Sequence, residues 1–312
     1  MQVNVTWTDA SLHYTKKQLY YMQIDKDVIY LKQRVLRVLL ITFVVIFAVS
    51  GYFLLNYWIN SKEQQAQFEE LVDVVQQAKQ EMQAATNPES QEPDTNTEET
   101  AQASSSPQVV EVKDPKTGAK RSVLGEYVTI YLMNQDTVGW MQIEGTEINY
   151  PVMQTPESPD YYLYRNFRKE GSSHGCLYVR EACNVEKPSD NLTIYGHKMK
   201  DGSMFAGLHE YENKAFWEQH RFIQFDTLTQ HNTYEILSVF LTTASEEGFA
   251  YHEFVDAADE AEFDDFVATC KQLALYDTGV TAEYGDKLIT LSTCEYSQTN
   301  GRLVVVAKRI SE

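Results

Sequence analysis

A cysteine and an arginine near the C-terminus are the first candidates for chemistry. Cys294 ends an apolar, β-branched run that begins at residue 287, and Arg302 opens a second such run that continues to residue 310. The pair Asn300-Gly301 between the two runs predicts a β-hairpin, because these residues accept the turn conformations that join antiparallel strands. The hairpin would set Cys294 and Arg302 side by side. A strand-end thiol facing a guanidinium is a candidate nucleophile beside an oxyanion stabiliser.

Among the seven histidines, His197 has the context most typical of chemistry. It follows an apolar-centred strand candidate at 191–195 that Gly196 ends, so its imidazole would lie at a strand end. His174 sits among glycines and serines, which predicts a surface turn. Four others lie in polar surroundings and are predicted to be solvated, namely His209, His220, His231 and His252.

The four cysteines argue against a zinc site, because no C-x-x-C pair and no H-E-x-x-H motif occurs. Cys270 lies on the apolar face of a predicted helix at 259–275 and is expected to be a small buried residue. Cys176 and Cys183 are seven residues apart, and an exported domain would permit a disulfide between them, although spacing alone does not establish the geometry. In either case Cys294 is the odd thiol and a candidate reactive group.

An apolar run near the N-terminus predicts a membrane anchor. Residues 38–55 contain eighteen residues without a charge, enough to span a bilayer, and we assign 36–59 to a transmembrane helix. Lys32, Arg34 and Arg37 precede the run, so the positive-inside rule places 1–35 in the cytoplasm and the rest outside. A cleaved signal peptide is disfavoured, because the preceding segment is long and no Ala-x-Ala-like site follows.

Three further segments follow the anchor. Apolar residues at spacings of three or four predict an amphipathic stalk helix at 60–83, which could also mediate dimer contacts. Residues 84–110 are rich in Thr, Ser, Glu, Gln and Pro and are predicted to be a disordered linker. Residues 111–312 have the length and aromatic content of one folded, extracytoplasmic domain. The net charge of −19 leaves no basic stripe for a nucleic acid partner.

This domain contains the strings YGHKMKDGSMF at 195–205 and TLSTC at 290–294, followed by Arg302. These strings resemble the motifs of the sortases, class B in particular. The likeness extends to DTVGW at 136–140 and INYPVMQ at 148–154, and it covers about 122–310. Class B sortases often have Asn after the catalytic histidine, where this chain has Lys198. The anchor and linker are similar to the family's usual layout.

The resemblance implies a mainly β fold, a closed eight-stranded barrel preceded by a helix. The residues agree with it, since 123–134 is a candidate helix and eight runs are β-like: 140–143, 147–152, 176–179, 192–195, 221–226, 234–241, 288–293 and 303–308. The helix at 259–275, inserted before the cysteine strand, is similar to the insertion that marks class B. No cofactor and no metal are implied.

The resemblance also implies a cysteine transpeptidase with His197, Cys294 and Arg302 as its catalytic residues. Cys294 would attack a Thr carbonyl in a C-terminal sorting signal, similar to Asn-Pro-x-Thr-Asn, and form a thioester. Arg302 and a backbone N–H near Glu295 would stabilise the oxyanion, while His197 would protonate the departing amine. The predicted substrate groove consists of Ser292, Thr293, Glu295 and Tyr296 with the segment 161–166. Ser292 could instead be a sheet hydroxyl that faces the core.

The expected partners are surface proteins that bear a sorting signal, the membrane, and an acceptor amine from a peptidoglycan precursor. A class B sortase that polymerises pilin through a pilin lysine is the alternative within the family. A papain-like hydrolase is disfavoured, because there the cysteine precedes the histidine and begins a helix. A membrane-tethered binding module with an inert Cys294 is the alternative outside enzymes.

Overall fold

The structure is a computed structural model that describes residues 9–86, 108–245, 247–297 and 299–310. It divides into two compact units, Met1–Asn60 and Ser61–Glu312. Helix α1 (Asp9–Thr86) runs through the described part of the first unit and into the second. Among the described residues, one helix stretch is long and apolar enough to cross a membrane, by length and composition, and it lies within Lys17–Ala84. The anchor predicted at 36–59 falls inside it.

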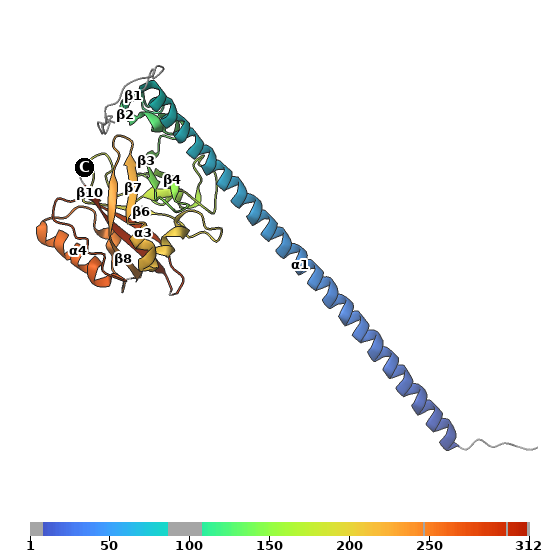
Figure 1. The fold of residues 1–312 in the computed structure, drawn as a ribbon. Coiled ribbons are helices and arrows are strands. Elements are labelled where there is room, and N and C mark those ends of the chain that lie inside the picture. Colours follow the sequence, from blue (N-terminus) through green and yellow to red (C-terminus); the bar gives the residue numbers. More distant parts are fainter. Residues whose placement is uncertain (1–8, 87–107, 246, 298, 311–312) are drawn as a thin grey trace, which may run out of the picture. The chain divides into compact units, whose positions relative to one another are not determined.

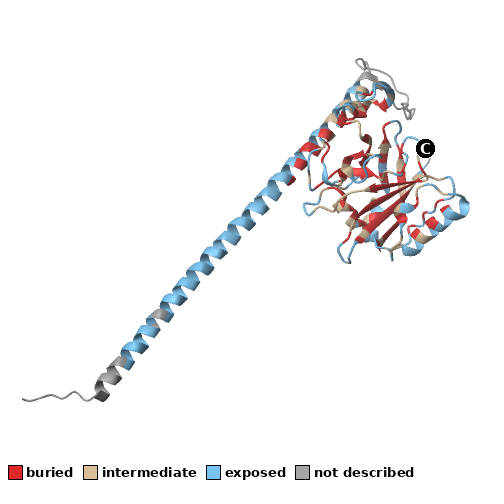
Figure 2. Cartoon of the chain, turned by 180° about the vertical axis from the view of Figure 1, so that it is seen from behind, coloured by how far each residue is buried: buried red, intermediate tan, exposed pale blue. Residues whose placement is uncertain are grey.

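The second unit is built around a closed eight-stranded barrel, as the sequence predicts (Figure 1). Its strands are joined in the order β10-β8-β7-β3-β4-β5-β6-β9. Their bounds are β3 (Thr137–Gln142), β4 (Asn149–Met153), β5 (Leu177–Val179), β6 (Asn191–Tyr195), β7 (Phe222–Thr227), β8 (Thr233–Thr243), β9 (Leu288–Cys294) and β10 (Gly301–Ile310). Each strand overlaps a run that its β-branched and apolar residues predict. Figure 2 shows the buried residues concentrated in these strands.

Short helices and a hairpin complete the second unit. They are the hairpin β1 (Val109–Lys113) and β2 (Lys120–Leu124), the 3-10 helices η1 (Gly125–Tyr127), η2 (Tyr161–Tyr164), η3 (Phe205–Glu212) and η4 (Tyr251–Glu253), and the helices α2 (Val128–Met133), α3 (Lys214–Gln219) and α4 (Glu260–Leu273). The helix predicted at 123–134 is therefore shorter than expected, because Val123 and Leu124 pair with β1 instead.

Helix α4 is the insertion predicted before the cysteine strand. Its N-terminus is capped, since the side chain of Asp259 accepts from the amide of Glu262 at 3.0 Å, and the Glu262 carboxylate accepts from the amide of Ala258 at 2.8 Å. Its apolar face packs on β8 and includes Cys270, which is fully buried as predicted. The insertion therefore adds a second small core to the side of the barrel.

The segment predicted as a stalk is helical, but its apolar side is not free. Phe68, Leu71 and Val75 are buried and belong to the same hydrophobic core as the barrel. The spacing of three and four thus produces a helix face that packs on the folded unit. The predicted linker at 84–110 lies largely outside the described residues, and β1 begins at Val109, within that range.

The two cysteines that left a disulfide open are not bonded to each other. Cys176 and Cys183 are both free and buried, and the Cys183 thiol donates to the carbonyl of Asn191 at 3.4 Å. Burial raises the pKa of the Cys183 thiol to about 11. Both cysteines are therefore packing residues, which leaves Cys294 as the half-buried thiol.

Candidate active site

Strands β9 and β10 place Cys294 directly opposite Arg302. The two are register partners in the antiparallel ladder, as the sequence predicts. The neighbouring pair is joined by the Glu295 amide, which donates to the carbonyl of Gly301 at 2.9 Å. Because hydrogen-bonded and non-hydrogen-bonded pairs alternate, Cys294 and Arg302 form a non-hydrogen-bonded pair, with Cα atoms about 4.5 Å apart and side chains on one face. Asn300 makes the turn possible by adopting a φ of 57°.

Strand β6 brings His197 to the same place from the other side of β9. The two strands are parallel, and Tyr195 is the register partner of Ser292. Two residues further along each chain are His197 and Cys294, so both follow the carboxyl ends of adjacent strands. Gly196 is required at this turn, because a Cβ there would come within 2.6 Å of the Phe205 ring and 2.5 Å of a Leu177 methyl group.

The imidazole of His197 is oriented by the segment before β5. Its Nε2 lies 2.7 Å from the carbonyl oxygen of Leu163, and since a carbonyl only accepts, Nε2 carries a proton. The Tyr164 ring lies over the imidazole, with ring centroids 5.6 Å apart. Nδ1 is therefore the nitrogen left to take up and release a proton. Both contacts come from within the predicted groove segment 161–166.

The guanidinium of Arg302 is held by its own loop. Its Nη1 donates to the carbonyls of Gly301 at 2.9 Å and Asn300 at 3.3 Å, and the remaining N–H groups have no partner among the described residues.

Tyr251 lies close enough to Arg302 and Cys294 for both to interact electrostatically with its hydroxyl. Burial raises the pKa of Tyr251, whereas the Ser292 hydroxyl and the charge of Arg302 oppose the rise.

The four predicted substrate residues divide into three buried side chains and one exposed side chain. Ser292 is 2% exposed and its hydroxyl lies 2.7 Å from the Tyr251 hydroxyl. Thr293 is also 2% exposed, and its hydroxyl has no partner among the described residues. The Glu295 carboxylate accepts hydrogen bonds from the amide and hydroxyl of Ser297, and these bonds lower its pKa. Tyr296, by contrast, is 70% exposed.

The backbone N–H expected near Glu295 for the oxyanion is not Glu295's own. That amide already donates to Gly301, and the Ser297 amide donates to the Glu295 carboxylate at 2.7 Å. The strand ladder and the turn therefore use these two donors. Among the described side chains at this strand end, the donor left for an oxyanion is Arg302.

Two residues near Cys294 escape prediction from the sequence. His209 was expected to be solvated, but its side chain is 14% exposed and Nε2 lies 3.1 Å from the carbonyl oxygen of Cys294. Tyr251 lies in η4, before helix α4, and its hydroxyl contacts that of Ser292. Phe205, Leu208 and Tyr211 recur every three residues and are buried, so their spacing could have indicated that one face of η3 is packed against the fold. It does not reveal what His209 contacts.

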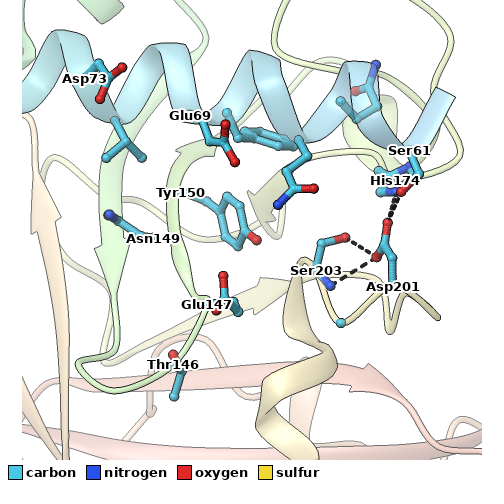
Figure 3. Close-up of a pocket in the computed structure, with 15 residues that line it drawn as sticks. Ser61, Glu69, Asp73, Thr146, Glu147, Asn149, Tyr150, His174, Asp201 and Ser203 are labelled. Carbon is cyan, nitrogen blue, oxygen red and sulfur yellow. Dashed lines mark hydrogen bonds and ion pairs between the residues drawn. The ribbon is translucent and has the colours of Figure 1, made fainter. Parts of the chain in front are cut away.

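A second polar cluster lies beyond the loop that follows His197 (Figure 3). His174 was expected in a surface turn, but it is 2% exposed and its Nε2 donates to Asp201 at 2.9 Å. Asp201 also accepts from Ser61 and from the hydroxyl and amide of Ser203. Burial alone would raise the pKa of Asp201, but the bonds from Ser203, Ser61 and His174 outweigh it and hold the pKa well below its usual range.

This cluster closes one end of a cleft of about 540 Å³. Residues of α1 from Ser61 to Asp73 form one wall, and Tyr150 and Glu147 are among those on the other.

The part of the chain that the structure describes holds no group of three or more His, Cys, Asp or Glu residues placed to bind a metal ion.

Comparison with known proteins identifies relatives of one kind. The family model described as the Sortase domain matches residues 141–310, more than half of the chain. Sortase B of Listeria monocytogenes is 34% identical over 198 residues, which cover 63% of this chain and 78% of the relative. A Staphylococcus aureus sortase B–substrate complex matches with a TM-score of 0.62 at 25% identity, over 81% of this chain and 99% of that chain. Sortase B from B. anthracis in complex with AAEK1 matches with a TM-score of 0.61 at 27% identity, over 82% and 100%.

Proposed function

The chain belongs to the sortase family, in its class B, and we propose that Cys294 is the nucleophile of a cysteine transpeptidase that cleaves sorting signals. The observation that carries the proposal is the cross-strand pair of Cys294 and Arg302, with His197 at the end of the adjacent parallel strand. These side chains come from three strands that the barrel holds in fixed register. A nucleophile, an acid–base group and a cation are the parts that acyl transfer needs.

Acylation begins with the thiolate of Cys294, because the thiolate and not the thiol is nucleophilic. It attacks the carbonyl carbon of the substrate Thr, and the electron pair of the C=O bond moves to oxygen. The free N–H groups of Arg302 stabilise this oxyanion. His197, protonated on Nδ1 and held through Nε2 by the Leu163 carbonyl, donates a proton to the amine as the C–N bond breaks. A thioester on Cys294 remains.

Deacylation reverses these roles. An incoming amine attacks the thioester, Nδ1 of His197 accepts its proton, and the Cys294 thiolate leaves. The tilted Tyr164 ring covers one side of the imidazole, which favours a single ring orientation in both half-reactions. Water can replace the amine, so slow hydrolysis accompanies transfer.

The substrate that fits the family is a protein with a C-terminal sorting signal similar to Asn-Pro-x-Thr-Asn. One similar structure is described as a sortase B–substrate complex. For this chain we assign peptide contact first to Tyr296, whose ring is exposed and lies 5.3 Å from the Lys198 ammonium. The side chains of Ser292, Thr293 and Glu295 are buried, so they support the same groove by fixing the strand end that carries Cys294.

The proposed location is the outer face of the cell membrane. The apolar stretch of α1 has the length of a single span, and the basic residues before it favour a cytoplasmic N-terminus. The catalytic unit would then meet exported proteins and cell-wall precursors. The acceptor is an amine of a peptidoglycan precursor, with a pilin lysine as the alternative within the family.

The test is peptide cleavage and transfer by the full chain in detergent. The substrate is a quenched sorting-signal peptide, offered with oligoglycine, a diaminopimelate-containing peptide or a lysine-containing pilin peptide as acceptor. We expect cleavage after Thr and an amide product with one acceptor, both lost in Cys294→Ala by about 10⁴-fold or more and both kept in Cys270→Ala, whose thiol lies in α4. Cleavage that survives in Cys294→Ala would refute the proposal.

A further inference from the structure

The carbonyl of Cys294 needs a hydrogen-bond donor that the barrel does not supply. The last bond of the β6–β9 ladder runs from the Gly196 amide to the Ser292 carbonyl, at 3.2 Å. The next carbonyl on that edge of β9 belongs to Cys294, but the chain has turned away at Gly196 to form the loop that begins with His197. His209, from η3, occupies this position, with Nε2 at 3.1 Å from the Cys294 oxygen.

The other ring nitrogen of His209 also faces an acceptor. Nδ1 lies 2.7 Å from Oε1 of Glu212, three residues along η3. A neutral imidazole carries one N–H and can serve only one of the two oxygens. An imidazolium donates to both, and the bond to a carboxylate is charge-assisted. The doubly protonated form is therefore the form that this arrangement satisfies.

We propose that His209, held in place by Glu212, is a positioning residue that fixes the backbone of the nucleophile Cys294. The role rests on the proposed function of Cys294, whereas the hydrogen bonds themselves do not. His209 touches neither the substrate nor the reacting sulfur in this arrangement. It acts by completing the edge of β9 at the residue where the strand ladder stops.

Two acidic groups and one cation share the surroundings of His209. Glu212 lies on its own element, and the Glu295 carboxylate faces it from the end of β9, where the imidazolium helps to lower the pKa of Glu295. From β10 the charged residue in register with Cys294 is Arg302.

The remaining elements packed against η3 carry charges with partners of their own. On α3, Lys214 places its ammonium 5.9 Å from the centre of the Trp217 ring, and Glu218 is exposed. On β8, Glu235 is paired with Arg221 at 2.7 Å. Glu212 and Glu295 are therefore the acidic groups that interact with His209.

Loss of one proton would break the arrangement at Cys294. The carboxylate is the stronger acceptor, so neutral His209 keeps its proton on Nδ1 toward Glu212. The Nε2 lone pair then faces the carbonyl oxygen of Cys294 with no proton between them. The strand end would lose its donor, and the reactivity of Cys294 would fall.

The test compares two substitutions, each of which keeps a nitrogen at the position of one of the two imidazole nitrogens. In His209→Gln the amide nitrogen takes the place of Nε2 and donates to Cys294 at every pH, whereas in His209→Asn it takes the place of Nδ1 and reaches only Glu212. With the full chain in detergent, we expect kcat/KM and the rate of Cys294 alkylation to fall about five- to tenfold in His209→Asn, the effect of one lost hydrogen bond. His209→Gln should restore most of both rates.

Equal loss in both variants at equal thermal stability would overturn the proposal. If His209→Asn folds poorly, the imidazole ¹⁵N shifts of the wild-type chain decide, with His209→Gln identifying the signals by their absence. We expect Nε2 of His209 to carry a proton, and an unprotonated Nε2 would contradict the proposal. Alkylation and imidazole shifts do not need a peptide substrate, so failure of peptide cleavage alone counts against the proposed function and not against this role.

Discussion

Two polar clusters flank the loop that follows β6, and they differ in how completely their atoms are bonded. In the cluster of Ser61, His174 and Asp201, both carboxylate oxygens of Asp201 accept hydrogen bonds and the buried histidine donates to it. At Cys294 the thiol, and Nδ1 of His197, have no hydrogen-bond partner among the described residues, while the Cys294 carbonyl and the Glu295 amide are both hydrogen-bonded. Bonded side chains stabilise a fold, whereas unpaired reactive atoms on a rigid backbone are available to a substrate.

This contrast predicts that substitutions at the two clusters affect different measurements. Changes beside Cys294 should lower the rate of acyl transfer while the free energy of unfolding stays nearly constant. Changes at Asp201 should lower the free energy of unfolding and leave the chemistry of Cys294 mostly intact. Each prediction below tests one side of that division.

The largest effect is expected for Arg302→Ala. Removing the guanidinium takes away the side-chain donor for the oxyanion, so kcat should fall by about 10²–10³-fold, as for other oxyanion donors. Steady-state cleavage of a sorting-signal peptide measures it, with thermal unfolding as the control. Arg302→Lys should recover little, because an ammonium does not reproduce the forked N–H geometry. Full activity in Arg302→Ala would remove Arg302 from the mechanism.

A smaller effect, on stability, is expected for Asp201→Asn. The amide loses the charge-assisted bonds to Ser203, Ser61 and His174, which should lower the free energy of unfolding by about 1–2 kcal/mol. The exposed Asp264→Asn on α4 is the matched control and should change it little. Denaturant unfolding measures both. A fall in kcat without a fall in stability would erase the contrast between the clusters.

The pH dependence of this difference has a defined sign. The hydrogen bonds to Asp201 hold its pKa below the usual value of about 3.9. A carboxyl group whose pKa is lowered by folding contributes stability above its unfolded pKa and loses it as pH falls through the folded pKa. The difference in the free energy of unfolding between wild type and Asp201→Asn should therefore be largest above about pH 5 and decrease below about pH 4.

The smallest effect is expected for Tyr296→Ala. The exposed ring contacts Lys198 at 5.3 Å and is assigned to peptide contact, so KM should rise about two- to fivefold, equivalent to an exposed cation–π contact, with kcat nearly unchanged. Tyr296→Phe keeps the ring and should behave as wild type. A large loss of kcat instead would mean that Tyr296 acts on the chemistry.

Local patterns were sufficient to predict the strands and the hairpin of the site. The β-branched runs and the Asn300-Gly301 turn fix which residues face each other, and the register of Cys294 with Arg302 follows. His197 could be found for a similar reason, since it directly follows a strand and a glycine. These features depend on residues that are close together in the sequence, so they can be predicted from it.

The residues that the sequence did not reveal depend on distant partners. His174 is buried because Asp201, 27 positions away, accepts a hydrogen bond from it, and His209 is half-buried against a carbonyl 85 positions away. The candidate groove was also only partly predictable, since Ser292 contacts Tyr251 of η4. Short-range composition made these histidines look solvated, because polar neighbours in sequence are not neighbours in space.

The most direct test of the account is to trap the acyl intermediate. The full chain is incubated with a sorting-signal peptide in the absence of an acceptor amine, digested and mapped by mass spectrometry. The account predicts an acyl group ending in the substrate Thr on the fragment that contains Cys294, removed by hydroxylamine as a thioester is. An acyl group on Cys176, Cys183 or Cys270, or peptide cleavage with no enzyme adduct at any time point, would contradict it.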